Sequence, residues 1–156
     1  MVLFIMNLVL DLNQLNYKGI FFHEPIKNTV MNDSDFIRII YSTDYFMMNG
    51  IYLKIHLNIA SIEKYFNKYK CIFNVECNKT IINELIQIEK NILSLVNNNK
   101  IPQYRIKEQL TAGYIKMFIS NYHKYNNSYF IVKISGLWET DNDCGLTFKF
   151  FEINHL

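Results

Sequence analysis

The chain has 156 residues, of which 50% are hydrophobic and 15% aromatic, and its 16 basic and 14 acidic residues leave a net charge of +2. This length fits one domain over residues 1–156, with enough apolar sequence to form a core without disulfides or structural metals. So small a net charge disfavours large-scale electrostatic capture of duplex DNA, but it leaves room for a local basic groove.

The N-terminal stretch MVLFIMNLVLDLN is the first apolar run. It lacks the positive region and the cleavage pattern of a signal peptide. About ten apolar residues are also too few for the roughly 20 that a membrane-spanning helix needs. We therefore predict a buried first strand, and a soluble protein with no membrane partner. A loop is expected next, over KNTVMNDSD at residues 27–35.

The following segment predicts strands. Residues 36–41 and 45–48 form one bent strand or two short ones. Asn49-Gly50 predicts a hairpin with a type I′ turn, because both central residues of that turn need positive φ. Beyond it, apolar and polar residues alternate over residues 51–58, which is typical of a half-buried strand with one solvated face.

Two helices are expected in the middle of the chain. A short one covers residues 61–70 with Ser61 as its cap, and CIFNV after it predicts a strand. A long one covers about residues 79–97 with Asn78 as its cap. Its apolar residues recur at three- and four-residue steps and form one stripe, which consists of Ile81, Leu85, Ile88, Ile92 and Leu95.

The C-terminal third predicts a helical turn at residues 105–110 and then three strands, in GYIKMFISNY, SYFIVKISGLWET and GLTFKFFEI. Such closely spaced strands, joined by HKYNN and DNDC, favour an antiparallel meander. Strands, then a long helix, then strands indicate an α+β fold. It is either an antiparallel sheet or an OB-like barrel, with one long covering helix between the N-terminal and C-terminal strand groups.

Three carboxylates alternate in the last loop, at Glu139, Asp141 and Asp143. Together they suit either a divalent cation, as in a metal-dependent nuclease, or a simple turn. Asp and Asn bind the backbone two residues on, and Gly145 tolerates positive φ, so we favour the turn. Gly136 marks a candidate β-bulge that would aim Trp138.

Catalytic signatures are missing from the sequence. It contains no G-x-S-x-G, C-x-x-C, P-loop or dinucleotide fingerprint, which disfavours an ordinary enzyme with a cofactor. The three cysteines, Cys71, Cys77 and Cys144, have neither disulfide-framework nor metal-ligand spacing. That pattern is typical of reduced, packed thiols inside a cell, in the cytoplasm or nucleus.

Aromatic and basic residues share strand faces, which is the strongest functional pattern in the chain. Single-stranded nucleic acid binds where bases stack on rings and lysines follow the phosphates. The alternative is that tyrosines are good strand formers, encoded by an AT-rich genome. The predicted nucleic-acid-binding residues are Tyr52, Lys54, His56, Lys116, Lys133, Trp138 and Lys149.

The C-terminal hairpin, with KISGLWET, a short acidic loop and GLTFKF, resembles small uncharacterised proteins of the large nucleocytoplasmic DNA viruses. GIYLKIHL and INELIQIEKNIL extend this resemblance over about the last two thirds of the chain. The order of elements is also similar to that of viral single-stranded-DNA-binding proteins with OB-like domains. The resemblance implies a viral accessory protein acting in the host cytoplasm or nucleus. Its partner is single-stranded nucleic acid or, alternatively, itself or another viral protein in the virion or its assembly.

Overall fold

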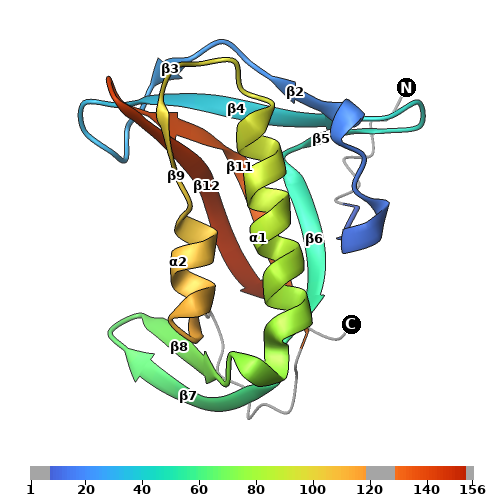
Figure 1. The fold of residues 1–156 in the computed structure, drawn as a ribbon, viewed down its shortest axis with the longest axis vertical. Coiled ribbons are helices and arrows are strands. Elements are labelled where there is room, and N and C mark those ends of the chain that lie inside the picture. The colour runs from blue at the N-terminus through green and yellow to red at the C-terminus, as the bar shows by residue number, and fades with distance from the viewer. Residues whose placement is uncertain (1–7, 119–128, 154–156) are drawn as a thin grey trace.

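The computed structural model describes residues 8–118 and 129–153. Within them the chain has an α+β fold, in which a 12-stranded, mostly antiparallel sheet carries one long and one short helix (Figure 1). The sheet does not close on itself, so the open sheet is present rather than the OB-like barrel. No helix in this part of the chain is long and apolar enough to span a membrane.

The strands are β1 (Leu10–Asp11), β2 (Ile20–Phe22), β3 (Ile26–Lys27), β4 (Asp35–Ser42), β5 (Met47–Asn49), β6 (Ile51–His56), β7 (Ile59–Tyr65), β8 (Lys68–Phe73), β9 (Ile101–Gln103), β10 (Tyr114–Phe118), β11 (Tyr129–Glu139) and β12 (Asp143–Glu152). The helices are α1 (Lys79–Ser94) and α2 (Arg105–Thr111), with short 3-10 turns at Leu12–Gln14, Tyr17–Gly19 and Glu76–Asn78. The main path of the sheet runs β1-β6-β11-β12-β10-β8-β7.

The long strand β11 is the centre of the sheet, because it pairs with β12 along one edge and with two strands along the other. Its first half pairs with β6 and its second half with β4. The register shifts between Ile134 and Gly136, which confirms the bulge expected at this glycine. A Cβ on Gly136 would clash with the carbonyl oxygen of Ile37, so only glycine fits where β4 pairs with this part of β11.

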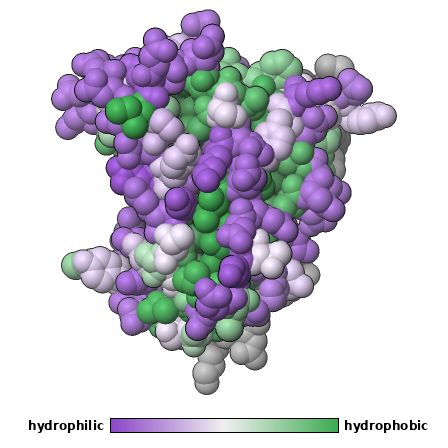
Figure 2. Space-filling model, in the orientation of Figure 1, coloured by the Kyte–Doolittle hydropathy of each residue, from purple (hydrophilic) through white to green (hydrophobic). Residues whose placement is uncertain are grey.

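The helices lie in front of β11 and β12 in Figure 1 and cover one face of the sheet. The apolar side of α1 is buried, through Ile82, Leu85, Ile88, Ile92 and Leu93. This stripe confirms the predicted helix but is rotated slightly from the expected one, since Ile81 is half-buried and Leu95 is exposed. Hydrophilic side chains dominate the helix-covered side of the molecule, with hydrophobic strips between them (Figure 2).

Asn78 begins α1 but does not cap it with its side chain. Instead its amide oxygen accepts the N–H of Asn58, and its amide nitrogen donates to the carbonyl oxygens of Asn58 and Asn74. This buried side chain therefore ties the end of β6 to the start of α1.

The helix predicted for residues 61–70 is wrong. This segment forms the β7–β8 hairpin, whose two-residue turn is Phe66-Asn67. In β8, Cys71 and Phe73 are buried, whereas the alternate residues Lys70 and Ile72 are less buried, which is a period of two rather than a helical stripe. Pairing of β8 with β10 further along the chain supports the strand.

The hairpin predicted at Asn49-Gly50 is also wrong. Asn49 ends β5, which pairs with β4, and the chain then leaves that pair to enter β6 beside β11. Gly50, at φ +92°, makes this corner, and its N–H donates to the carbonyl oxygen of Ile39. The hairpin turn lies earlier, where the N–H of Thr43 donates to the carbonyl oxygen of Phe46. The segment over residues 36–48, predicted as one bent strand or two short ones, therefore forms two strands, β4 and β5.

The predicted meander is correct only for its last two strands. β11 and β12 pair antiparallel, but β10 pairs with β12 in parallel and with β8 in antiparallel orientation. The HKYNN loop lies outside the described residues, as does the start of the N-terminal apolar run, of which Leu10–Asp11 forms the short strand β1. The helical turn expected at residues 105–110 is α2.

Candidate nucleic-acid interface

One face of the sheet is turned away from the helices, and we call it the outer face. Buried residues alternate along the strands and join those of α1 and α2 in one core. The residues between them therefore point to the outer face, since successive side chains of a strand alternate.

Four lysines form a row across the outer face, one on each of four adjacent strands. Lys133 of β11 lies opposite Lys149 of β12, and Lys116 of β10 lies opposite Lys70 of β8. The two pairs are joined because β10 and β12 run parallel with Met117 beside Phe150, which places the residues before these, Lys116 and Lys149, side by side. We call Lys133, Lys149, Lys116 and Lys70 the lysine row.

Like charges directly opposite each other destabilise a sheet, and little compensates them here. Within the described residues, ion pairs occur at Lys79–Glu76 and Arg105–Glu108, neither of them part of the row. The register places one carboxylate next to the row, that of Glu63 beside Lys70 on the last strand, β7. The row is therefore a concentrated positive strip on a nearly neutral protein.

Aromatic rings lie among these lysines. The ammonium group of Lys133 is 5.3 Å from the ring centre of Tyr52 on β6. The ring of Tyr114 lies 4.5 Å from the ammonium group of Lys70 and 5.6 Å from that of Lys116. Rings held by cations in this way present a flat face of fixed orientation, which suits the stacking of a base.

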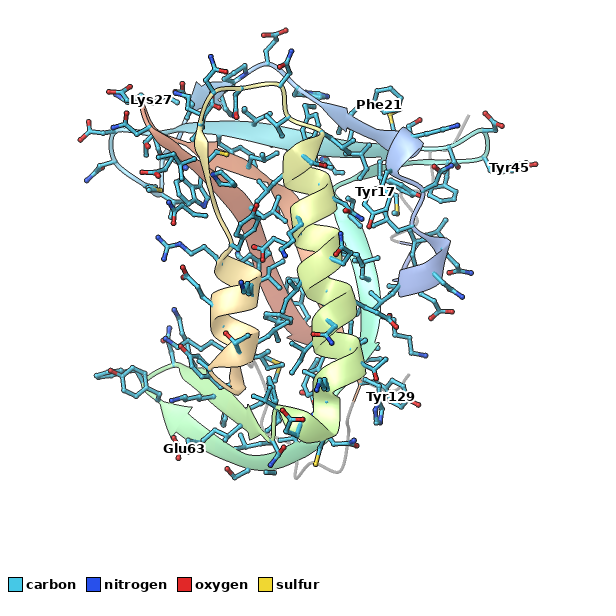
Figure 3. All side chains as sticks on the ribbon, in the orientation of Figure 1. Tyr17, Phe21, Lys27, Tyr45, Glu63 and Tyr129 are labelled. Carbon is cyan, nitrogen blue, oxygen red and sulfur yellow. The ribbon has the colours of Figure 1, made fainter. Side chains whose placement is uncertain are left out.

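A second group adjoins the row at the other end of β6 and β11. Tyr129 pairs with His56, their ring centres 4.8 Å apart, and the ammonium group of Lys54 lies 4.8 Å from the ring of Tyr129. Figure 3 shows Tyr129 at the margin of the molecule. The row and this group together place lysines and rings side by side across β6, β11, β12, β10 and β8.

The structure brings six of the seven predicted residues together on this outer face, namely Tyr52, Lys54, His56, Lys116, Lys133 and Lys149. Trp138 is on the same face but at the far end of β11. It lies opposite Gly145, which is four residues before Lys149, or about 13 Å along the strand. Trp138 is half-buried and packs on Gly145, where a Cβ would lie 2.7 Å from the indole ring.

Lys70 and Tyr129 were missed by the sequence reasoning. Lys70 falls in the segment that was expected to be helical, although Lys68, Lys70 and Ile72 alternate with Cys71 and Phe73 there. That alternation was the pattern that could have revealed it. Tyr129 belongs to the strand predicted for SYFIVKISGLWET, but only the register with His56 shows its place beside the other site residues.

The last loop forms the expected turn, but the side chains that hold its backbone are Thr140 and Lys100 rather than the three carboxylates. The N–H groups of Asn142 and Asp143 donate to the hydroxyl of Thr140, and the carboxylate of Asp143 accepts a bond from Gln103. Glu139 instead accepts a bond from Asn98, and Asp141 is exposed. Lys100 closes the turn by donating to the carbonyl oxygens of residues 140 and 141.

Three titratable groups whose pKa values are shifted lie in the core. Burial raises the pKa of the Cys71 thiol to about 11 and also raises the pKa of Cys144. Burial likewise raises the pKa of Glu89, although its carboxylate accepts the N–H groups of Ile106 and Lys107 at the start of α2. Glu89 therefore anchors α2 to α1.

Comparison with known proteins adds no family to this description. No family model, no curated protein and no solved structure matches the chain.

Proposed function

We propose that the protein binds single-stranded nucleic acid on the outer face of its sheet. The observation that carries the proposal is the lysine row, in which four ammonium groups on adjacent strands face the same side. A folded protein gains no stability from lysines placed directly opposite one another. Local rules of this kind are broken mainly at functional sites, and a strand of phosphates is the ligand whose charge this row complements.

The aromatic rings give the second part of the mechanism. In this arrangement phosphates follow the row, while bases stack on the rings of Tyr52, Tyr114 and Tyr129. Each stacked base contributes about 1–3 kcal/mol and favours no particular sequence. A solvated sheet face that carries aromatic rings suits unpaired bases better than the edges of a duplex.

The resemblance of the KISGLWET hairpin supports a viral setting for this activity. We propose an accessory protein of a large DNA virus that acts on single strands in the host cytoplasm or nucleus. Its three cysteines are free in the structure, and two of them are buried, which is compatible with a reducing compartment.

The test is fluorescence anisotropy of a labelled oligothymidylate of about 20 nucleotides, longer than the roughly 4–16 that one OB domain covers. Anisotropy is a better reporter than Trp138 emission, because the indole is distant from the row. With four phosphates contacted, log K should fall with log salt at a slope near −3, or about 50-fold between about 50 and 200 mM salt. Absence of binding at micromolar concentrations, or binding indifferent to salt, would contradict the proposal.

A second candidate function is that of a structural or interaction protein with no nucleic-acid role, assembling with itself or with another virion protein. Exposed apolar side chains around β2 to β5 favour it. Val30 is 94% exposed, Tyr45 93% and Met47 72%, and Phe21 and Tyr45 project from this end of the molecule in Figure 3. Light scattering distinguishes the two functions, since a stable oligomer that ignores oligothymidylate supports assembly.

A further inference from the structure

A pocket lies where the lysine row meets the edge of the sheet. It is lined by Tyr65, Lys68, Tyr69, Lys70 and Lys116. Two of these residues, Lys70 and Lys116, belong to the row, and the others come from the β7–β8 hairpin. This hairpin forms one end of the molecule in Figure 1.

The row cannot continue beyond this pocket. β7 is the last strand of the sheet, and the residue that it places beside Lys70 is Glu63. Figure 3 shows Glu63 at this margin. A nucleic-acid chain whose phosphates follow the row from Lys133 to Lys70 would next meet the carboxylate of Glu63. Like-charge repulsion therefore favours a nucleic-acid chain that ends in the pocket.

The positive charge of the pocket fits a phosphate at the end of a nucleic-acid strand better than a phosphate in its interior. A phosphodiester inside a strand carries one negative charge. A terminal phosphate monoester carries about −1.5 to −2 at neutral pH, with three acceptor oxygens. Three lysines line this one pocket, which matches the larger charge and number of acceptors of the monoester.

The tip of the hairpin supplies a separate indication. Phe66 is 81% exposed and has φ +55°. In a two-residue turn with positive φ at its first position only, glycine is the favoured residue and an aromatic ring is strained. The ring of Phe66 contacts that of Tyr65 edge to face, with centres 4.8 Å apart, so two rings stand next to the pocket. Strain retained at an exposed ring points to a use for that ring.

We propose that this pocket holds the terminal phosphate of a single strand, while Tyr65 and Phe66 contact the last base. The inference rests on the proposed function and adds a preference for strand ends to it. The lysine row binds the strand, and the pocket sets where its end lies.

The experiment compares oligothymidylates of one length that differ only at their ends: 5′-phosphorylated, 3′-phosphorylated, hydroxyl-ended and circular. The chain with the preferred phosphorylated end should bind about five- to tenfold more tightly than the hydroxyl-ended and circular ones, as one added charge-assisted contact predicts. Lys68→Gln should remove this preference. Lys64→Gln is the matched control, because this exposed lysine is on the same hairpin but does not line the pocket.

Each outcome separates the two proposals. Equal affinity for all four oligonucleotides would overturn the end pocket and leave the lysine row standing. A preference that survives Lys68→Gln but is lost in Lys64→Gln would also overturn the pocket. Binding of none of the four would overturn the nucleic-acid function itself, and the end pocket with it.

Discussion

Lys133 on β11 and Lys149 on β12 lie directly opposite each other on the outer face of the sheet, with no described carboxylate in an ion pair with either. The same arrangement recurs at Lys116 and Lys70 on the next two strands. Cross-strand pairs of this kind destabilise a sheet. The lysines of the outer face should therefore lower the stability of the protein while they allow it to bind an anionic polymer, and the loss of stability can be measured.

Lys149→Gln should stabilise the protein, because it removes one charge that faces like charges on both neighbouring strands. The free energy of unfolding should rise by about 0.2–1 kcal/mol at low salt and by less at high salt. Urea denaturation measures it. Lys90→Gln is the control, since Lys90 is exposed on α1, and its effect should stay near zero. A loss of stability in Lys149→Gln would contradict the repulsion.

Phe66→Gly should leave the protein as stable or make it more stable by up to about 1 kcal/mol, because glycine accepts positive φ without strain. It should also weaken the preference for a phosphorylated end, because the ring at the hairpin tip is lost. Thermal unfolding and the end-comparison assay measure the two effects. Destabilisation by more than about 1 kcal/mol would show that Phe66 serves the fold.

Glu89→Gln should destabilise the protein by about 1–3 kcal/mol. The carboxylate is 0% exposed, and its two oxygens accept separate N–H groups, those of Ile106 and Lys107. A glutamine offers one oxygen, so one buried donor loses its acceptor. Glu84→Gln, exposed on the same helix, should change stability by less than about 0.5 kcal/mol. Chemical denaturation of both variants measures the difference.

The pH dependence of this effect has a definite sign. The folded state raises the pKa of Glu89 above its ordinary value of 4.5, mainly by burial. The folded protein then binds more protons than the unfolded chain at pH values just above 4.5, so this group makes stability fall as pH rises through that window. The stability advantage of the wild type over Glu89→Gln should be largest at low pH and shrink as pH rises. An advantage that grows with pH would show that the hydrogen bonds outweigh desolvation.

Thiol reagents should modify Cys77 alone among the three cysteines of the folded protein. Cys77 is exposed, whereas Cys71 and Cys144 are buried and burial raises the pKa of both thiols. Mass spectrometry should find one label per native chain, none in Cys77→Ser, and labels on all three cysteines in denaturant. Rapid native labelling of Cys71 would mean that β8 opens readily.

Local sequence patterns predicted the elements whose causes are local. Helix α1 follows from its apolar stripe, and the β11–β12 turn follows from the hydroxyl of Thr140, which accepts the N–H groups of Asn142 and Asp143. The prediction for residues 61–70 failed because β7 is exposed at nearly every position and so shows no strand alternation, while the partner that supports β8 is β10, more than 40 residues further on. Asn49-Gly50 failed for a similar reason, since β6 is held by β11 and not by its sequence neighbour.

The candidate site was predicted in its residue types but not in its geometry. Alternation in β6 was enough to place Tyr52, Lys54 and His56 on one solvated face. The alignment of Lys70 with Lys116, and of Lys149 with Lys133, depends on the register between strands that are distant in sequence. Trp138, which was predicted among the binding residues, lies at the other end of the face because the bulge at Gly136 and the pairing with β4 place it there.

The most direct measurement of the central claim is the salt dependence of oligothymidylate binding by two double variants of equal charge. Lys133→Gln with Lys116→Gln alters the lysine row, and Lys90→Gln with Lys107→Gln alters exposed lysines of the two helices. The row variant should lose affinity at least tenfold at low salt, and its slope of log K against log salt should become shallower by about 1.4, which is 0.7 for each lost contact. The helix variant should keep both values. Equal losses of affinity in the two variants would show that binding depends only on the net charge of the protein. That result would contradict the outer face as the binding site.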